Sequence, residues 1–119
     1  MSEILVLDDI EDAAVLIQRI LTRRGHNVSC FCDEDKAIAY AAEKNVDLAV
    51  LDIKLKKMDG MQVLRELKKL QPEMKAIMLT GYPTIESARE ALEFGAAEYC
   101  VKPIDKKELE EKVASVLTC

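Results

Sequence analysis

Three aspartates, one threonine and one lysine lie at or just past the ends of short apolar runs: Asp8, Asp9, Asp52, Thr80 and Lys102. Carboxylates that meet at one place repel each other, and without compensation at least one keeps its proton near neutral pH. A divalent cation removes this repulsion, and Mg²⁺ favours oxygen ligands while leaving positions for water and phosphate. A carboxylate beside such a cation, an ammonium group and a hydroxyl is suited to attack phosphorus, because phosphoryl transfer depends mainly on positioning and charge stabilisation.

Asp52 is the best choice of nucleophile among the three carboxylates. Asp8 and Asp9 are adjacent in the chain, so their side chains diverge. This suits one of them to direct metal binding and the other to a role through water. Asp52 stands alone after an apolar run that is typical of a central strand. We therefore expect Asp52 to be a covalent nucleophile that forms an acyl phosphate, with the metal and Lys102 stabilising the charge.

The elements that would position these residues alternate regularly along the chain. Continuous apolar runs predict buried strands at residues 4–7, 28–32, 47–51, 76–79 and 98–101. Apolar residues at helical spacing predict a helix after each strand. Strict alternation of strand and helix predicts an α/β fold, in which helices cover both faces of a parallel sheet. Because such strands expose their carboxyl ends at one edge, we expect the five polar residues to gather there.

Helix ends are predicted from residues that favour caps and stops. Gly25 and Gly95 are expected to end helices, since glycine adopts the left-handed conformation that a helix end requires. Asp33, Asp59 and Asp105 are expected to cap the helices that follow them. These three acids are therefore assigned to structure rather than to chemistry.

The helix after the fourth strand is predicted from its own apolar spacing. Pro83 is expected to open this helix, because proline suits the first helical turn. The pattern then predicts that Ile85, Ala88 and Leu92 face inward.

Length and composition predict one soluble domain over residues 1–119. The net charge of -5 and the scattered basic residues argue against direct binding of nucleic acid, which requires a basic surface. We expect no leader peptide, because the short apolar run after Met1 has no basic flank or cleavage site, and no apolar stretch approaches the roughly 20 residues that a membrane helix needs. We therefore expect a cytoplasmic protein with free thiols.

The cysteines do not predict a metal site. Cys30 and Cys32 lie close together, but the single histidine, His26, falls in an expected turn, and a zinc site needs more ligands at suitable spacing. We expect Cys30, Cys32 and Cys100 to be small buried hydrophobic residues.

Taken together and in order, the motifs at the strand ends resemble the receiver domain of a two-component response regulator, over the whole chain. The matching segments are Leu7-Asp8-Asp9, Val50-Leu51-Asp52, Met58-Asp59-Gly60, Thr80-Gly81, Tyr99 and Val101-Lys102-Pro103. Residues 80–103 are most similar to receivers that precede effector domains in transcriptional regulators of the nitrogen-control type. The resemblance implies a doubly wound, flavodoxin-like sheet of five parallel strands in the order 2-1-3-4-5, with five helices.

The resemblance also implies a metal site and a phosphodonor. Asp9, Asp52 and the backbone carbonyl of Lys54 would bind Mg²⁺ directly, and Asp8 mainly through water. Asp52 would receive the phosphoryl group from a histidine kinase or a phosphotransfer protein. The domain would promote its own phosphorylation and dephosphorylation, and would not be an enzyme that acts on a separate substrate.

For the phosphorylated form, the resemblance implies a coupled rearrangement. Lys102 would pair with a phosphate oxygen, and a cis peptide bond before Pro103 would fix its direction. Thr80 would swing to the phosphate, and Tyr99 would turn into the vacated space. The surface that changes would lie within residues 84–117 and would control an effector domain or another output protein. The surface of the last two helices is also where phosphorylated receivers commonly pair as homodimers.

Three positions bear on how this sequence differs within the family. Family members often carry proline four residues after the phosphoacceptor, and here that position is Lys56. Lys54 and Tyr82 lie where family members vary and where side chains shield the acyl phosphate from water. Two bulky residues at these positions predict slow hydrolysis.

Other interpretations of the same residues remain open from sequence alone. A degenerate receiver that only binds partner proteins is the main alternative. A flavin or nucleotide binder would carry glycine, serine or threonine after the first strand, where this chain has acids. A haloacid-dehalogenase-like phosphatase would place a second aspartate at position 10, which is Ile10. Asp8 and Asp9 as helix caps, Thr80 as a turn residue and Tyr99 as a static aromatic are the simpler structural roles.

Overall fold

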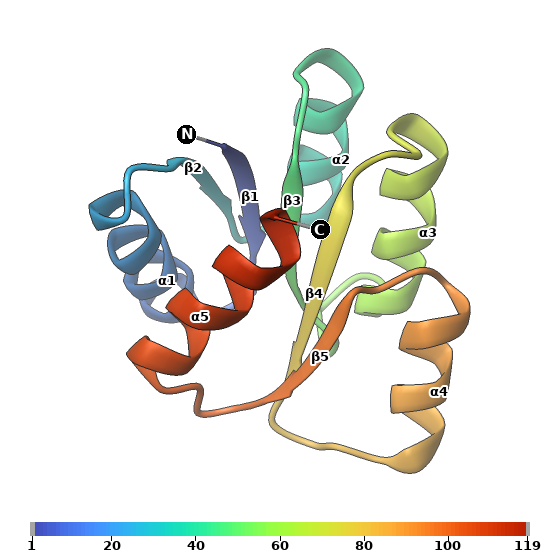
Figure 1. The fold of residues 1–119 in the computed structure, drawn as a ribbon. Helices are drawn as coiled ribbons and strands as arrows, with labels where there is room; N and C mark the ends of the chain where they lie inside the picture. The colour runs from blue at the N-terminus through green and yellow to red at the C-terminus, as the bar shows by residue number, and fades with distance from the viewer. Residues whose placement is uncertain (1, 119) are drawn as a thin grey trace.

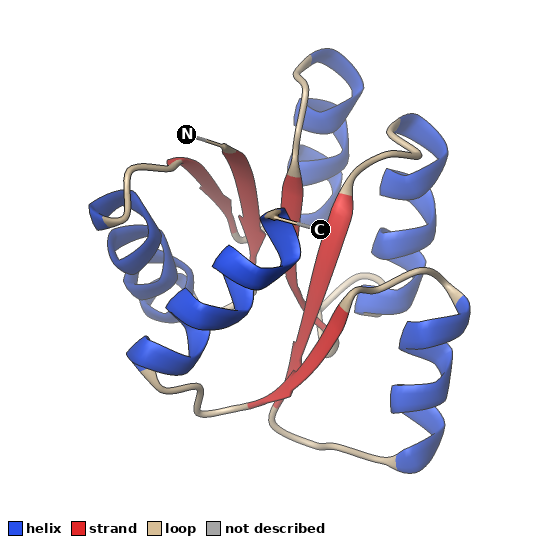
Figure 2. Cartoon of the chain, in the orientation of Figure 1, coloured by secondary structure: helices blue, strands red, loops and turns tan. Residues whose placement is uncertain are grey.

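A computed structural model describes residues 2–118, in which five strands alternate with five helices (Figures 1 and 2). The elements are β1 (Glu3–Leu7), α1 (Glu11–Arg23), β2 (Asn27–Phe31), α2 (Glu34–Glu43), β3 (Leu48–Asp52), α3 (Gly60–Leu70), β4 (Lys75–Thr80), α4 (Ile85–Glu93), β5 (Glu98–Val101) and α5 (Lys106–Leu117). All strand pairs are parallel, and the order is β2-β1-β3-β4-β5. The predicted doubly wound sheet and its strand order are confirmed.

The helices cover the two faces of the sheet unequally (Figure 1). Along β1, Ile4 and Val6 pack with buried residues of α1 and α5, whereas Leu5 and Leu7 pack with those of α2, α3 and α4. Successive side chains of a strand point to opposite faces, so both faces of β1 are buried. This is why the central strands are continuous apolar runs rather than alternating ones.

The predicted helix caps hold at two of three positions. The carboxylates of Asp59 and Asp105 accept hydrogen bonds from backbone N–H groups of the first turns of α3 and α5. Asp33 occupies the cap position of α2 without such a bond, and its carboxylate instead lies 2.8 Å from the ammonium group of Lys57. Both glycine stops are confirmed, with φ of 90° at Gly25 and 92° at Gly95.

The predicted inward face of α4 is wrong. Ile85 and Leu92 are 74% and 70% exposed, Ala88 is half-buried, and the buried residue of the helix is Ala91. Apolar spacing identifies a stripe on a helix, but the residue that α4 buries, Ala91, lies outside the predicted stripe. Pro83 does not open the helix either, since Thr84 is its cap.

The cysteines differ in their exposure to solvent. Cys100 is buried and Cys30 half-buried, as expected for small apolar residues, but Cys32 is exposed, which corrects that prediction.

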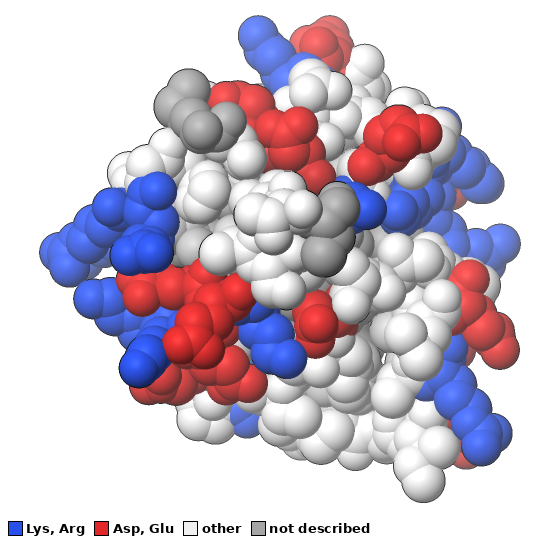
Figure 3. Space-filling view, viewed as in Figure 1, with Lys and Arg blue, Asp and Glu red and all other residues white. Residues whose placement is uncertain are grey.

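None of the helices in residues 2–118 is long and apolar enough to cross a membrane. On the face shown in Figure 3, acidic and basic side chains are interspersed around an uncharged area near β5 and α4.

Candidate functional site

The parallel register brings the strand ends to one edge of the sheet. Leu7 of β1 lies opposite Leu51 of β3, so Asp8 and Asp52 both follow at the carboxyl edge. Thr80 of β4 lies opposite Val101 of β5, which places Lys102 just beyond it. The five polar residues predicted to gather therefore come from four strand ends that are neighbours in the sheet.

The three predicted carboxylates form a compact cluster. Asp8, Asp9 and Asp52 each offer an oxygen, and these three atoms lie within 4.8 Å of one another. Asp8 is 1% exposed and Asp52 is 6% exposed. The second oxygen of Asp8 contributes to the turn before α1, since Oδ1 accepts the N–H of Ile10 at 2.9 Å. Two of the three acids are therefore withdrawn from solvent.

Lys102 is the cation that faces this cluster. Its Nζ lies 2.6 Å from Asp8 Oδ2 and 3.2 Å from Asp52 Oδ2, so it donates to both carboxylates. Burial by itself would lower the pKa of Lys102, but the hydrogen bonds and charges of Asp8 and Asp52 outweigh it and raise that pKa. Lys102 is therefore charged at neutral pH and available to pair with an anion.

The charge balance of the site favours a divalent cation. Burial raises the pKa of Asp52, the attraction of Lys102 opposes this, and the neighbouring charges of Asp8 and Asp9 raise it further. Three carboxylates against one ammonium group leave two negative charges without compensation in a largely buried place. Hard oxygen ligands with this excess charge fit Mg²⁺, which usually binds to one or two carboxylates and keeps several waters.

Thr80 ends β4 at the edge that carries the acids, and Tyr82 lies in the loop that follows. Thr80 is 2% exposed, and its Oγ1 accepts the backbone N–H of Tyr82 at 3.0 Å. Tyr82 is 68% exposed, and the Lys54 ammonium group lies 4.2 Å from the centroid of its ring. The two bulky side chains singled out in the sequence are thus in contact with each other, through a cation–π interaction that links the loop after β3 to the loop after β4.

Tyr99 is joined to the start of α4. Its hydroxyl lies 2.5 Å from Ser87 Oγ and accepts the backbone N–H of Thr84 at 3.3 Å. Thr84 and Ser87 also form the capping box of α4. Any displacement of the Tyr99 ring therefore breaks hydrogen bonds at the N-terminus of this helix.

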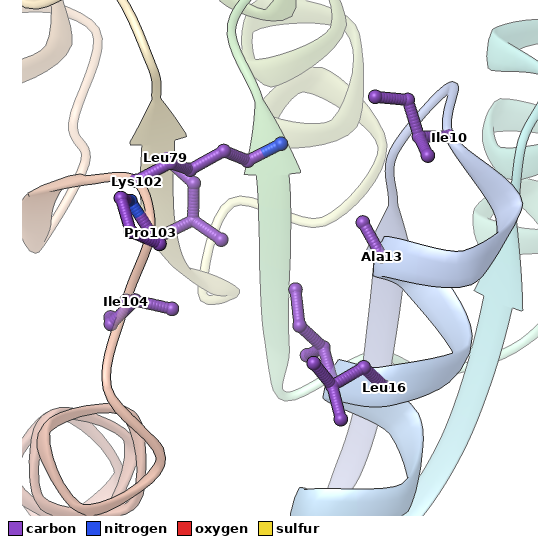
Figure 4. A pocket seen from close by; sticks show the side chains of 8 residues that line it. Ile10, Ala13, Leu16, Leu79, Lys102, Pro103 and Ile104 are labelled. Carbon is purple, nitrogen blue, oxygen red and sulfur yellow. The ribbon is translucent and has the colours of Figure 1, made fainter.

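An apolar groove adjoins the site beside Lys102 (Figure 4). Its lining comes from α1, from β4 and from the segments after β1 and β5: Ile10, Ala13, Leu16, Ile17, Leu79, Lys102, Pro103 and Ile104. Ile10 and Leu16 are 59% and 58% exposed although they are large and apolar. The Lys102–Pro103 peptide bond in this segment is cis, as the family resemblance predicts.

One buried acid, Glu34 at the start of α2, was not predicted from the sequence. It is 1% exposed, and its carboxylate accepts backbone N–H groups of Lys57 and Met58 in the loop after β3. Its place at the start of a helix suggested only a favourable interaction with the helix dipole. Nothing in its local sequence indicates a contact 23 positions away.

Sequence comparisons place the chain among response regulators. It matches the response regulator receiver domain family over residues 4–114. The putative response regulator NtrX-like of Rickettsia bellii (strain RML369-C) is 37% identical over 109 residues, which cover 90% of this chain and 23% of that protein. Its name agrees with the resemblance to nitrogen-control regulators. The chain spans about a quarter of the length of several curated regulators that it matches.

Solved structures agree with this match. A CheY-like receiver domain protein from Methanospirillum hungatei JF-1 gives a TM-score of 0.95 at 33% identity, covering 99% of this chain and 94% of that one. A response regulator from Burkholderia pseudomallei, solved with a phosphorylated aspartic acid, a calcium ion and citrate, gives 0.88 at 31% identity, covering 98% and 66%. Because motif, sequence and fold agree over nearly its whole length, this chain belongs to the response regulator receiver domain family.

Proposed function

We propose that this chain is a phosphorylation-operated switch in which Asp52 accepts a phosphoryl group. The observation that carries the proposal is the shared contact of Lys102 with Asp8 and Asp52 beside a third acid, Asp9. An oxygen of the Asp52 carboxylate attacks phosphorus, the bond from phosphorus to the donor breaks, and the electron pair leaves with the donor. The product is an acyl phosphate on Asp52.

Mg²⁺ fits the excess negative charge of the acids. Asp9, Asp52 and the carbonyl of Lys54 would hold it directly, and Asp8 through water. When bound, the metal stabilises negative charge on the phosphoryl oxygens and relieves the repulsion among the carboxylates. In the related Burkholderia pseudomallei structure, a phosphorylated aspartic acid and a divalent ion occur in the same crystal, which supports this assignment.

Lys102, Thr80 and Tyr99 rearrange when Asp52 is phosphorylated, and this changes the surface of the domain. Lys102 releases Asp52 and pairs with a phosphoryl oxygen, and the Thr80 hydroxyl turns from the Tyr82 N–H to donate to another. Tyr99 then leaves Ser87 and moves inward, which frees the N-terminus of α4. The surface of α4, β5 and α5 changes and controls an effector domain or output protein, or pairs with a second phosphorylated copy. The module acts in the cytoplasm on its own aspartate.

Intact mass after incubation with acetyl phosphate and Mg²⁺ tests the proposal. We expect one added phosphoryl group on the wild-type chain, none after Mg²⁺ is removed with EDTA, and none in Asp52→Asn. No adduct on the wild-type chain, even with rapid quenching, would favour the alternative of a degenerate receiver that only binds partner proteins.

The phosphodonor is proposed to be a histidine kinase or phosphotransfer protein that docks on the apolar groove beside Lys102. The groove borders the site, so a helix seated against Ile10 and Leu16 brings its own phosphohistidine to Asp52. A protein donor needs this apolar contact, whereas a small donor such as acetyl phosphate does not.

Leu16→Ala is therefore expected to affect the two donors differently. Because one central apolar contact contributes about 1–2 kcal/mol to docking, transfer from a phosphorylated kinase domain should fall about tenfold. Transfer from acetyl phosphate should be unchanged. Leu92→Ala removes another exposed leucine, from α4, and serves as control. Equal losses with both donors would place the effect in the fold and not in docking.

Tyr82 and Lys54 are proposed to slow hydrolysis of the acyl phosphate by shielding it from water. In Tyr82→Ala we expect a half-life about two- to fivefold shorter, since an exposed cation–π contact contributes about 0.5–1 kcal/mol. The half-life is measured by mass spectrometry after the chain has been phosphorylated and the donor removed, with Leu92→Ala again as control. A wild-type half-life of only seconds would contradict the shielding role.

A further inference from the structure

The loop between β3 and α3, residues 53–59, lies next to Asp52 and carries Lys54. Its base is fixed by backbone hydrogen bonds. The N–H of Ile53 donates to the Leu79 carbonyl at 2.9 Å, and the N–H of Gly60 donates to the Ile53 carbonyl at 2.6 Å. These bonds close the loop, but none of them involves the main chain of residues 54–58, where only the side chains of Leu55 and Met58 pack against the core.

Glu34 holds the far part of this loop. Its Oε2 accepts the N–H of Lys57 at 2.5 Å and the N–H of Met58 at 3.0 Å. Within residues 2–118, no side chain other than Glu34 hydrogen-bonds to the main chain of residues 54–58. The loop is therefore anchored at its base by the sheet and at its tip by α2.

The side chain of Lys57 adds an ion pair to the same region, but of a weaker kind. Its Nζ lies 2.8 Å from Asp33 and 3.2 Å from Asp35, and the side chains of Lys57 and Asp35 are 56% and 67% exposed. Exposed ion pairs contribute little, because solvent screens them. Hydrogen bonds from backbone N–H groups to a buried carboxylate are shorter and stronger, so Glu34 dominates the contact.

Glu34 keeps its charge in this position. Burial alone would raise the pKa of its carboxyl, but hydrogen bonds from its own backbone N–H and those of Lys57 and Met58 lower it further than burial raises it. An ionised carboxylate accepts hydrogen bonds and donates none, which matches the two N–H groups it faces.

We propose that Glu34 is a positioning residue that restrains the β3–α3 loop and thereby holds the Lys54 carbonyl at the metal site. The inference rests on the proposed function, which makes that carbonyl a metal ligand. Groups that orient a metal ligand affect the affinity for the metal although they do not touch it. Where the family often stiffens this loop with proline, this chain has Lys56, and Glu34 supplies the restraint from a neighbouring helix.

The test compares Glu34→Gln with Asp35→Asn. Both substitutions remove one negative charge from the first turn of α2, so their long-range effects on the metal are matched. Only Glu34→Gln weakens the acceptor of the loop N–H groups, because a neutral amide oxygen replaces an ionised carboxylate oxygen. We expect its Mg²⁺ affinity, measured by titration calorimetry, to fall about tenfold, with Asp35→Asn within about twofold of wild type. Phosphorylation by acetyl phosphate at limiting Mg²⁺ should slow by a similar factor.

Amide hydrogen exchange separates positioning from general loss of structure. In Glu34→Gln the amides of Lys57 and Met58 should exchange faster, while those of the central strand residues Val50 and Leu79 stay protected. If Glu34→Gln does not fold, Glu34→Asp replaces it, because the shorter side chain keeps the charge but withdraws it from the loop. We then expect a smaller loss of Mg²⁺ affinity.

Equal Mg²⁺ affinities in Glu34→Gln and Asp35→Asn, despite faster exchange of the loop amides, would overturn the proposal. Unchanged exchange of these amides would also overturn it. A wild-type chain that binds Mg²⁺ but takes no phosphoryl group would defeat the proposed function, while the calorimetric comparison would still decide the role of Glu34. A wild-type chain that binds no Mg²⁺ would defeat both.

Discussion

A Lys102→Met variant is expected to bind Mg²⁺ more tightly than the wild-type chain and yet to be phosphorylated much more slowly. The Lys102 ammonium group contacts Asp8 and Asp52, so it competes with a metal for the same oxygens. The Coulomb energy of two unit charges about 4 Å apart is about 4 kcal/mol near a protein surface. Removal of the competing Lys102 ammonium group should therefore tighten Mg²⁺ binding at least about tenfold. Loss of a preorganised donor to the phosphoryl oxygens should slow phosphorylation of Asp52 about 100-fold.

Calorimetry with Mg²⁺ and a mass time course with acetyl phosphate measure these two effects separately. Lys112→Met is the matched control. The Nζ of Lys112 lies 3.2 Å from Glu98, and this ion pair involves none of the three site acids. It should leave both quantities unchanged. Weaker Mg²⁺ binding in Lys102→Met would show that the lysine supports the metal site, contrary to the competition argued here.

Gly60→Ala is expected to destabilise the fold by about 3 kcal/mol, at the upper end of the cost of overpacking. A Cβ atom on Gly60 would lie 2.3 Å from the carbonyl oxygen of Asp52 and 2.7 Å from the Cα of Ile53. Both neighbours are backbone atoms, so no side chain can rotate to make room. The chain must shift at Asp52 itself, and we therefore expect slower phosphorylation as well as lower stability.

Urea unfolding measures the free energy of unfolding of this variant. Gly81→Ala is the control, because a Cβ at Gly81 meets no atom within 4 Å. A substitution of this kind usually changes stability by less than about 0.5 kcal/mol. Equal stability of the two variants would mean that α3 moves away from β3 without cost, and that the close contact has no structural importance.

The fold followed from the sequence because its signals are local and repeated. Each apolar run identified a strand, and parallel pairing then required that Asp8, Asp52, Thr80 and Lys102 meet at one edge. Capping also depends on nearby residues, which explains why Asp59 and Asp105 were predicted correctly. Where a residue chooses among distant partners, prediction failed, as with Asp33, which binds Lys57 instead of capping.

The orientation of α4 and the contact of Glu34 with the β3–α3 loop could not be predicted from the sequence, because both depend on tertiary packing. Periodicity fixes the relative positions of Ile85 and Leu92 on a helix, but which stripe packs inward depends on the space left by β4 and β5. Here small alanines fit that space, and the large residues remain outside. Glu34 depends on the path of a loop that has no regular pattern of its own.

The two partners of the partly buried ion pair, Asp8 and Lys102, are 94 positions apart in the chain. During synthesis the acids emerge first, and the lysine follows only when most of the domain has left the ribosome. Contacts between distant segments form late, since closing a long loop is entropically costly. A nascent chain therefore carries the aspartates without their ammonium partner, and the contact between Asp8 and Lys102 forms only once the last strand has joined the sheet.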